Sequence, residues 1–120
     1  MQRFKNKIVV ITGAGSGIGR STALRLDSEG ADLLMIDKNQ GDLDETKKML
    51  KNKNSSAHIV DISSIISTKN FFKDVEKNYK RLDALINIAG ILRFDNSHEV
   101  ELENWNQILD INLTGTFFMC

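Results

Sequence analysis

Apolar residues along the chain gather in two kinds of segment that alternate. Four short runs are nearly continuous in apolar residues, as is typical of strands buried on both faces of a sheet, and they lie at 8–11, 33–36, 57–60 and 84–87. The longer segments that follow them have apolar residues at helical spacing, and they lie at 17–29, 43–53, 65–80 and from 103 onward. This alternation predicts an α/β fold, a doubly wound parallel sheet with helices on both faces. In such a sheet, ligands bind beyond the carboxyl ends of the strands.

The loop after the first strand is unusually rich in glycine. Thr12 to Gly19 reads TGAGSGIG and contains four of the eight glycines in the chain. Glycines permit a tight turn and let backbone N–H groups come close to a pyrophosphate, and the helix N-terminus adds about half a positive charge. Because the loop joins a buried strand to a helix, it predicts a dinucleotide site.

Two other interpretations of this loop remain open. A tight strand-to-helix turn that binds no ligand would also use glycine. A P-loop of the nucleotide triphosphatases is the second alternative, with Gly19-Arg20-Ser21 where Gly-Lys-Ser would stand. Arg20 does not easily replace the compact ammonium group of that lysine, which disfavours the P-loop.

An acidic residue, Asp37, ends the second apolar run. It lies about 20 residues beyond the glycine loop, where a carboxylate accepts a hydrogen bond from a ribose 2′-hydroxyl. A 2′-phosphate about 4 Å away would meet a repulsion of roughly 4 kcal/mol at an effective dielectric constant near 20. The residue therefore favours NAD over NADP, although Lys38 can swing towards a phosphate and weaken that preference. A solvated aspartate at a strand end is the plainer alternative.

Further motifs follow the third and fourth strands and lie in the last helix. They are Asp61-Ile62, Asn87-x-Ala89-Gly90 with Ile88 between, and Asn112 within DINLTG. Together with Thr12-Gly13-x-x-x-Gly17-Ile18-Gly19, their order resembles the short-chain dehydrogenase/reductase family across nearly the whole chain. The resemblance implies a Rossmann-type fold with strand order 3-2-1-4 in this part. Ile88 stands where the family has a second asparagine, which puts the local hydrogen bonding there in doubt.

The resemblance also implies roles for individual positions. The pyrophosphate would be surrounded by Gly13, Ser16, Gly17, Ile18 and Gly19. Asp37 would bind the adenosine ribose, and Asp61 with Ile62 would bind the adenine. The path to the nicotinamide ribose would be lined by Asn87, Ala89 and Gly90. Asn112 matches the asparagine of the catalytic tetrad, whose backbone carbonyl holds a water of the proton relay.

The rest of that tetrad is expected outside these residues. In the family a Ser and a Tyr-x-x-x-Lys follow the segment seen here, whereas the one tyrosine of this chain, Tyr79, precedes the fourth strand and lacks the lysine. We therefore expect residues 1–120 to be the incomplete N-terminal half of the domain, truncated after about four strands. The full enzyme would transfer hydride between the nicotinamide and a carbonyl or alcohol substrate, and this part alone would be inactive.

Composition excludes several other classes of protein. Lys plus Arg and Asp plus Glu both number 16, so the chain lacks the positive charge of a nucleic-acid binder. The single cysteine rules out an intrachain disulfide. No apolar stretch approaches the roughly 18 residues of a membrane span, and none resembles a signal peptide, so we expect a cytoplasmic protein. The two histidines lack partners at ligand spacing, and we expect no metal site.

Three hypotheses about the function remain open at this point. The first is the cofactor-binding part of an NAD-dependent oxidoreductase. The second is a non-catalytic nucleotide-binding module that pairs with another chain, and the third is an interaction protein without a ligand. Titration with NAD and a dehydrogenase assay distinguish them. The family commonly forms dimers or tetramers, so a homo-oligomer is also an open alternative.

Overall fold

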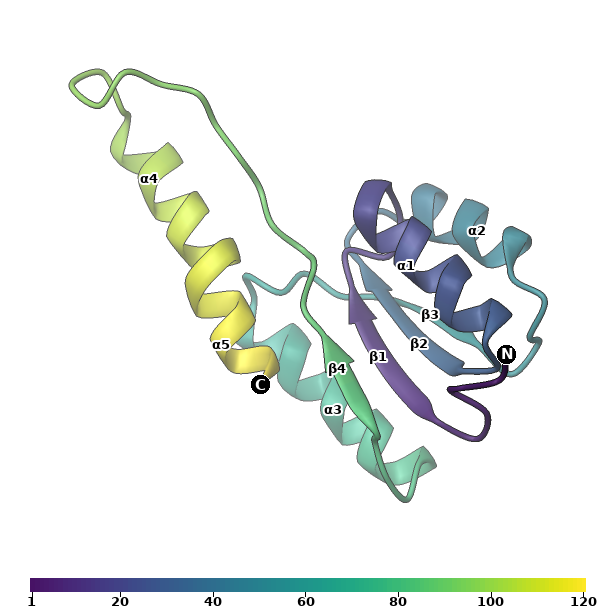
Figure 1. The fold of residues 1–120 in the computed structure, drawn as a ribbon. Coiled ribbons are helices and arrows are strands. Elements are labelled where there is room, and N and C mark those ends of the chain that lie inside the picture. The colour runs from purple at the N-terminus through teal and green to yellow at the C-terminus, as the bar shows by residue number, and fades with distance from the viewer.

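The computed structural model describes all residues from 1 to 120. Along the chain the elements are β1 (Ile8–Thr12), α1 (Gly17–Ser28), β2 (Asp32–Asp37), α2 (Gln40–Met49), β3 (Ser56–Ile59), α3 (Ile65–Asn78), β4 (Ala84–Ile86), α4 (Leu102–Leu109), the π-helical segment η1 (Asp110–Gly115) and α5 (Thr116–Met119). The strands form one parallel sheet in the order β3-β2-β1-β4 (Figure 1). This confirms the predicted fold class and strand order.

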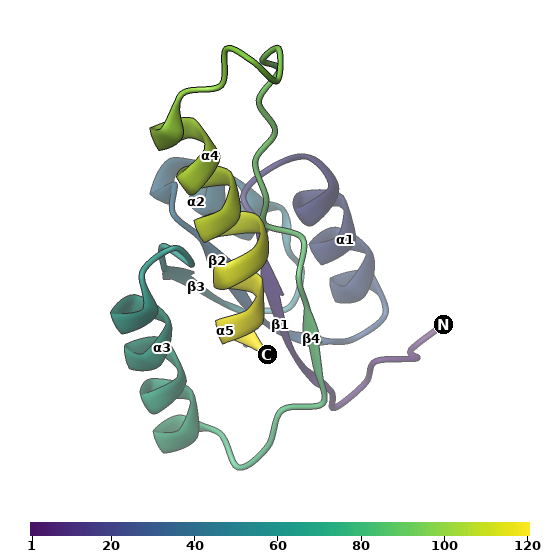
Figure 2. The ribbon, with the colours of Figure 1, turned by 90° about the vertical axis from the view of Figure 1, so that its left-hand side faces the viewer.

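Each central strand buries both of its faces. Val9 and Ile11 of β1 belong to the apolar cluster under α1 and α2, whereas Val10 between them belongs to the cluster under α3 and α5. The same alternation divides Leu33 from Leu34 in β2. Figure 1 shows α1 and α2 on one side of the sheet and α3 and α5 on the other, and in Figure 2 α3 and α5 lie in front of the sheet with α1 and α2 behind it. The continuous apolar runs of the sequence follow from this arrangement, because side chains of a strand point alternately to its two faces.

Two helices differ from the prediction. Helix α2 begins at Gln40 and not at 43, because the Asn39 side chain accepts a hydrogen bond from the Asp42 amide at 3.0 Å and caps the helix there. The last helix is not regular, since η1 inserts a π-helical turn between α4 and α5. Both features depend on local hydrogen bonds, and the spacing of apolar residues in the sequence does not report them.

Helix α4 projects away from the sheet together with the segment that precedes it (Figure 1). None of its residues is buried, and Leu102 and Trp105 are 71% and 55% exposed. The radius of gyration is 15.2 Å, compared with about 14 Å for a compact domain of this length. No helix is long and apolar enough to cross a membrane.

Glu29, just after α1, ties the N-terminal segment to the helix. Its carboxylate accepts hydrogen bonds from Arg3 Nε at 2.5 Å, Arg3 Nη2 at 2.7 Å and Arg25 Nε at 2.5 Å. Although both arginines are largely exposed, the Glu29 side chain is only 6% exposed. The hydrogen bonds from Arg3 and then Arg25 lower the pKa of Glu29 from its ordinary 4.5 to about 2.

This lowered pKa predicts a dependence of stability on acid. Because the folded carboxyl group has the lower pKa, its contribution is present above pH 4.5 and is lost as the pH falls towards 2. We expect Glu29→Gln to lower the melting temperature at pH 7 and to weaken its dependence on pH across this window. Thermal unfolding between pH 2 and pH 7 measures the effect. Glu76→Gln, at an exposed position of α3, is the matched control and should change neither quantity. Parallel pH profiles for Glu29→Gln and the unaltered chain would contradict the assignment.

Candidate functional site

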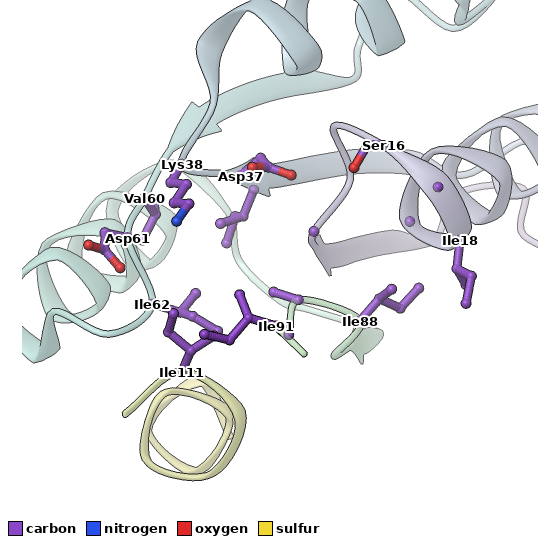
Figure 3. A pocket seen from close by; sticks show the side chains of 16 residues that line it. Ser16, Ile18, Asp37, Lys38, Val60, Asp61, Ile62, Ile88, Ile91 and Ile111 are labelled. Atoms are coloured by element: carbon purple, nitrogen blue, oxygen red, sulfur yellow. The ribbon is translucent and has the colours of Figure 1, made fainter. Parts of the chain in front are cut away.

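The carboxyl ends of all four strands meet at one edge of the sheet. Thr12 of β1 pairs with Ile36 of β2, and Asp37 pairs with Ile59 of β3. On the other side of β1, Ile11 pairs with Ile86, the last residue of β4. The segments that follow the strands therefore come together, and they enclose an open cavity of about 320 Å³ (Figure 3).

The cavity brings together most of the residues that the sequence predicted. Of the expected cofactor positions, those that line it are Gly13, Ser16, Gly17, Ile18, Gly19, Asp37, Asp61, Ile62, Ala89 and Gly90. Sequence reasoning treated Lys38 only as a complication and missed the apolar walls, which are Ile36, Val60, Ile88, Ile91 and Ile111. Ile36 could have been found as the last apolar residue before Asp37, whereas no sequence signal places Ile111 here.

Two glycines allow the loop after β1 to pack tightly. Gly13 has a φ of +67°, and a Cβ there would lie 2.8 Å from the Ala89 nitrogen. A Cβ at Gly19 would overlap the carbonyl oxygen of Gly13. Helix α1 thus starts directly against the loop, with no room for side chains at these two positions.

The same packing leaves backbone donors available at the start of α1. The amide groups of residues 16–19 donate no hydrogen bond within the chain, and the Ser16 side chain does not cap the helix. A helix N-terminus with free N–H groups attracts an anion. These groups lie on the cavity wall, as Ser16 and Ile18 do in Figure 3. The geometry therefore fits a pyrophosphate.

Asp37 is held in place at the rim of the cavity by backbone groups. Its Oδ2 accepts a hydrogen bond from the Gly15 amide at 3.0 Å, and its Oδ1 accepts one from the Asn39 amide at 3.1 Å. A carboxylate oxygen has a further lone pair after one such bond. The carboxylate can therefore also accept hydrogen bonds from ribose hydroxyl groups.

The far end of the cavity is an apolar slot with one carboxylate. Val60, Ile62 and Ile111 are 5%, 7% and 8% exposed and form part of its walls. Beside them, Asp61 Oδ1 accepts hydrogen bonds from the Ser63 amide at 2.9 Å and the Ser63 hydroxyl at 2.6 Å. Apolar walls with a few oriented polar groups are typical of a site for a flat organic ring. An adenine with its amino group near Asp61 fits this description.

The sequence model of the short chain dehydrogenase family matches residues 7–120. This chain belongs to the short chain dehydrogenase family. The chain is 32% identical to a 3beta-hydroxysteroid dehydrogenase of Mediterraneibacter gnavus, and the match covers 100% of this chain and 45% of that protein. It is 31% identical to a meso-2,3-butanediol dehydrogenase of Serratia marcescens, with 97% and 46% covered.

Solved structures of dehydrogenases and reductases share its fold. The levodione reductase structure is 29% identical with a TM-score of 0.91, and the match covers 98% of this chain and 47% of that one. A short chain dehydrogenase from Bacillus anthracis is 26% identical with a TM-score of 0.88, with 94% and 46% covered. The chain thus spans about half the length of these relatives. Short chain dehydrogenases are oxidoreductases that bind nicotinamide dinucleotides.

Two of the expected site residues do not line the cavity. Asn87 is exposed at the end of β4, and its amide nitrogen lies 3.5 Å from Cys120 Sγ, outside the cavity. Asn112 in η1 instead exchanges two hydrogen bonds of 2.8 Å with the backbone of Ile91. These hydrogen bonds fix the segment after β4 to η1. Because Ile91 lines the cavity, the Asn112 side chain supports the cavity wall without being part of it.

The P-loop alternative is left without its cation. Arg20 does not line the cavity, because its guanidinium group turns towards α2 and donates to Gly15, Thr46 and Glu45. No cluster of three or more His, Cys, Asp or Glu side chains that could hold a metal ion is present either.

Thr12 joins the glycine loop to the segment after β4. Its Oγ1 accepts hydrogen bonds from the amides of Ile88 and Ala89, both at 3.1 Å, and Thr12 is 1% exposed. We expect Thr12→Val to leave both donors without an acceptor and to lower the free energy of unfolding by about 2 kcal/mol. Thr12→Ser keeps the hydroxyl group and should cost clearly less. Urea denaturation of both variants measures the difference, and equal losses would contradict this role.

Proposed function

We propose that this chain is the cofactor-binding part of an NAD-dependent oxidoreductase that acts on a carbonyl or alcohol substrate. The observation that carries the proposal is the cavity at the carboxyl edge of the sheet. There the free amides of residues 16–19, the Asp37 carboxylate and an apolar slot follow one another in the order pyrophosphate, ribose, adenine. Bound there, the nicotinamide would supply or accept a hydride at its C4 atom.

The residues of the chain have separate tasks in this proposal. The helix α1 amides and Ser16 bind the pyrophosphate, with Gly13 and Gly19 leaving room for its close approach. Asp37 binds the adenosine ribose, and Asp61 with Ile62 binds the adenine. Ala89 and Gly90 lead towards the nicotinamide ribose, whereas Asn87 lies outside the cavity as the structure has it. Asn112 supports the catalytic proton relay through its backbone.

We infer a preference for NAD over NADP from Asp37. The Gly15 and Asn39 amides hold the carboxylate where the ribose 2′-hydroxyl would bind. A 2′-phosphate would add negative charge against a carboxylate that cannot turn away without losing both hydrogen bonds. Lys38 is the cation that lines this part of the cavity, and Figure 3 shows it between Asp37 and Asp61.

The proposed substrate class is supported by the relatives and not by the cavity. The relatives named above are dehydrogenases of a hydroxysteroid and of a butanediol, and D-threitol dehydrogenase of Mycolicibacterium smegmatis is 32% identical to this chain. The compounds in these names all have a hydroxyl group on carbon, which supports an alcohol or its carbonyl product as the substrate here.

Binding without turnover by residues 1–120 is the second candidate. Tyr79 is the one tyrosine of the chain, and it packs against the apolar cluster under α3, away from the cavity. No tyrosine hydroxyl of this part can therefore donate or accept the proton that accompanies hydride transfer.

Calorimetric titration with NAD and NADP, combined with a dehydrogenase assay, tests the proposal. We expect NAD to bind at least ten-fold more tightly than NADP, and we expect these 120 residues to show no turnover. Equal affinities would contradict the NAD preference. A folded protein that binds neither nucleotide would overturn the proposed function, and turnover by this chain would contradict the assignment of the proton donor to other residues.

A further inference from the structure

Arg20 holds the carbonyl group of Gly15 at the tip of the glycine loop. Its Nη2 donates to the Gly15 oxygen at 2.5 Å, and its Nε donates to the same oxygen at 3.0 Å. On its other side, the guanidinium group contacts α2 through Thr46 Oγ1 at 3.0 Å, the Glu45 carboxylate at 2.9 Å and the Asp42 carbonyl at 3.4 Å. One side chain of α1 thus connects the loop to the neighbouring helix.

Thr46 of α2 lies next to both Arg20 and the Gly15 carbonyl group. It is fully buried, and its hydroxyl group lies 3.0 Å from the Ala14 carbonyl oxygen, 3.1 Å from that of Asp42 and 3.3 Å from that of Gly15. A hydroxyl group has one proton to donate and can accept as well. The carbonyl oxygens of Ala14 and Asp42 are both nearer to this hydroxyl group than the Gly15 oxygen, and Thr46 accepts a hydrogen bond from Arg20. Arg20 is therefore the principal donor to Gly15.

The orientation of this carbonyl decides where the next amide points. In a trans peptide the C=O and N–H bonds are coplanar and point in opposite directions. Because the Gly15 oxygen faces Arg20 and α2, the Ser16 N–H must face away from α2. That amide has no acceptor within the chain, and Ser16 lines the cavity.

We propose that Arg20 is a positioning residue for the cofactor: by holding the Gly15 carbonyl against α2, it directs the Ser16 amide at the pyrophosphate. The inference rests on the proposed function, since it assigns to Arg20 the geometry of that same site. Arg20 touches no part of the dinucleotide in this role. Its own charge is partly balanced by Glu45, so geometry and not charge is its main contribution.

The other side of the Gly15 residue is fixed independently. The Gly15 amide donates to Asp37, and Asp37 keeps a second donor in the Asn39 amide. Loss of Arg20 should therefore disturb the peptide between Gly15 and Ser16 while the ribose carboxylate stays in place. Loss of Arg20 should therefore lower the affinity for ligands that have phosphate groups more than the affinity for ligands that lack them.

The test compares Arg20→Met and Thr46→Val with Arg25→Met, which removes the same charge from the far end of α1. Affinities for NAD and ADP are measured by calorimetry, and the affinity for adenosine by NMR titration, which also follows the Ser16 amide resonance. We expect Arg20→Met to weaken NAD and ADP binding about ten-fold, as loss of a hydrogen bond to a charged group would do. Adenosine binding should change less than about two-fold, and the shift of the Ser16 resonance on adding ADP should shrink. Thr46→Val should have a smaller effect of the same kind, and Arg25→Met none.

Each alternative has its own outcome. Equal losses for ADP and adenosine would show a merely structural role and overturn the inference, as would unchanged NAD binding by Arg20→Met. A further variant, Arg20→Lys, keeps the charge but cannot reproduce the paired contacts of the guanidinium group. Full NAD affinity in this variant would assign the effect to charge and would also overturn the inference. An unaltered protein that binds none of the three ligands would overturn the proposed function itself.

Discussion

Gly19→Ala is expected to abolish measurable NAD binding and to lower the free energy of unfolding by about 3 kcal/mol. The new Cβ would overlap the Gly13 carbonyl oxygen and lie 3.1 Å from the Ala14 Cα, and both of these are backbone atoms that cannot rotate away. Gly13 cannot retreat either, because it already packs on the backbone of Ala89. The loop would have to open, and the free amides at the start of α1 would lose their common orientation.

Chemical denaturation and calorimetric titration with NAD measure the two effects of this substitution. Gly41→Ala in α2 is the matched control, since its Cβ would meet only the Asn39 Oδ1 at 3.5 Å, an ordinary contact. Alanine in a helix is favoured over glycine by about 0.5–1 kcal/mol, so this variant should be slightly more stable and bind NAD normally. Normal NAD affinity in Gly19→Ala would refute the close packing of loop and helix as the basis of the site.

Asp37→Ser is expected to reduce NAD affinity roughly 100-fold, because hydrogen bonds to a charged group contribute about 1.5–3 kcal/mol each. Removal of the carboxylate also removes the repulsion of a 2′-phosphate, and Lys38 remains on the cavity wall. The affinity for NADP should therefore rise, and the ratio of the two affinities should approach or cross one. Titration of both nucleotides under one salt condition gives that ratio, since ionic strength screens the charges.

Asp44→Ser is the control for this substitution. It removes the same charge from an exposed position on α2, outside the cavity, and should leave both affinities as they are. If Asp37→Ser kept the original ratio of NAD to NADP affinity, the carboxylate would not be the group that discriminates between them. If Asp44→Ser shifted the ratio as much, long-range charge and not contact with the ribose would be responsible.

Several parts of the site could be predicted because they depend on local sequence. Val9, Val10 and Ile11 form a continuous apolar run, which reports burial on both faces without knowledge of the neighbouring helices. The contact between Gly19 and Gly13 is equally local, since a Cβ at Gly19 would overlap the carbonyl oxygen of Gly13 six residues earlier. Asp37 follows from its place at the end of a strand, and it lies at the rim of the cavity as expected.

Other parts could not be predicted because they depend on contacts between distant segments. Nothing about Asn112 in sequence indicates that its side chain binds the backbone of Ile91, 21 positions away. Asn87 belongs to a recognisable motif, yet it does not line the cavity, and its amide nitrogen lies 3.5 Å from Sγ of Cys120, 33 positions away. Arg20 was considered only as a substitute for a P-loop lysine, and its contacts with Thr46 required α2 to be packed against the loop.

The amino-acid order by itself determined the alternation of strands and helices, the close turn after β1 and the carboxylate after β2. These are properties of periodicity and of single side chains, which a chain expresses over a few neighbouring residues. Only the tertiary structure decided which walls close the cavity, which amides remain free and which side chain holds them, because each depends on strand ends and helices meeting across the sheet.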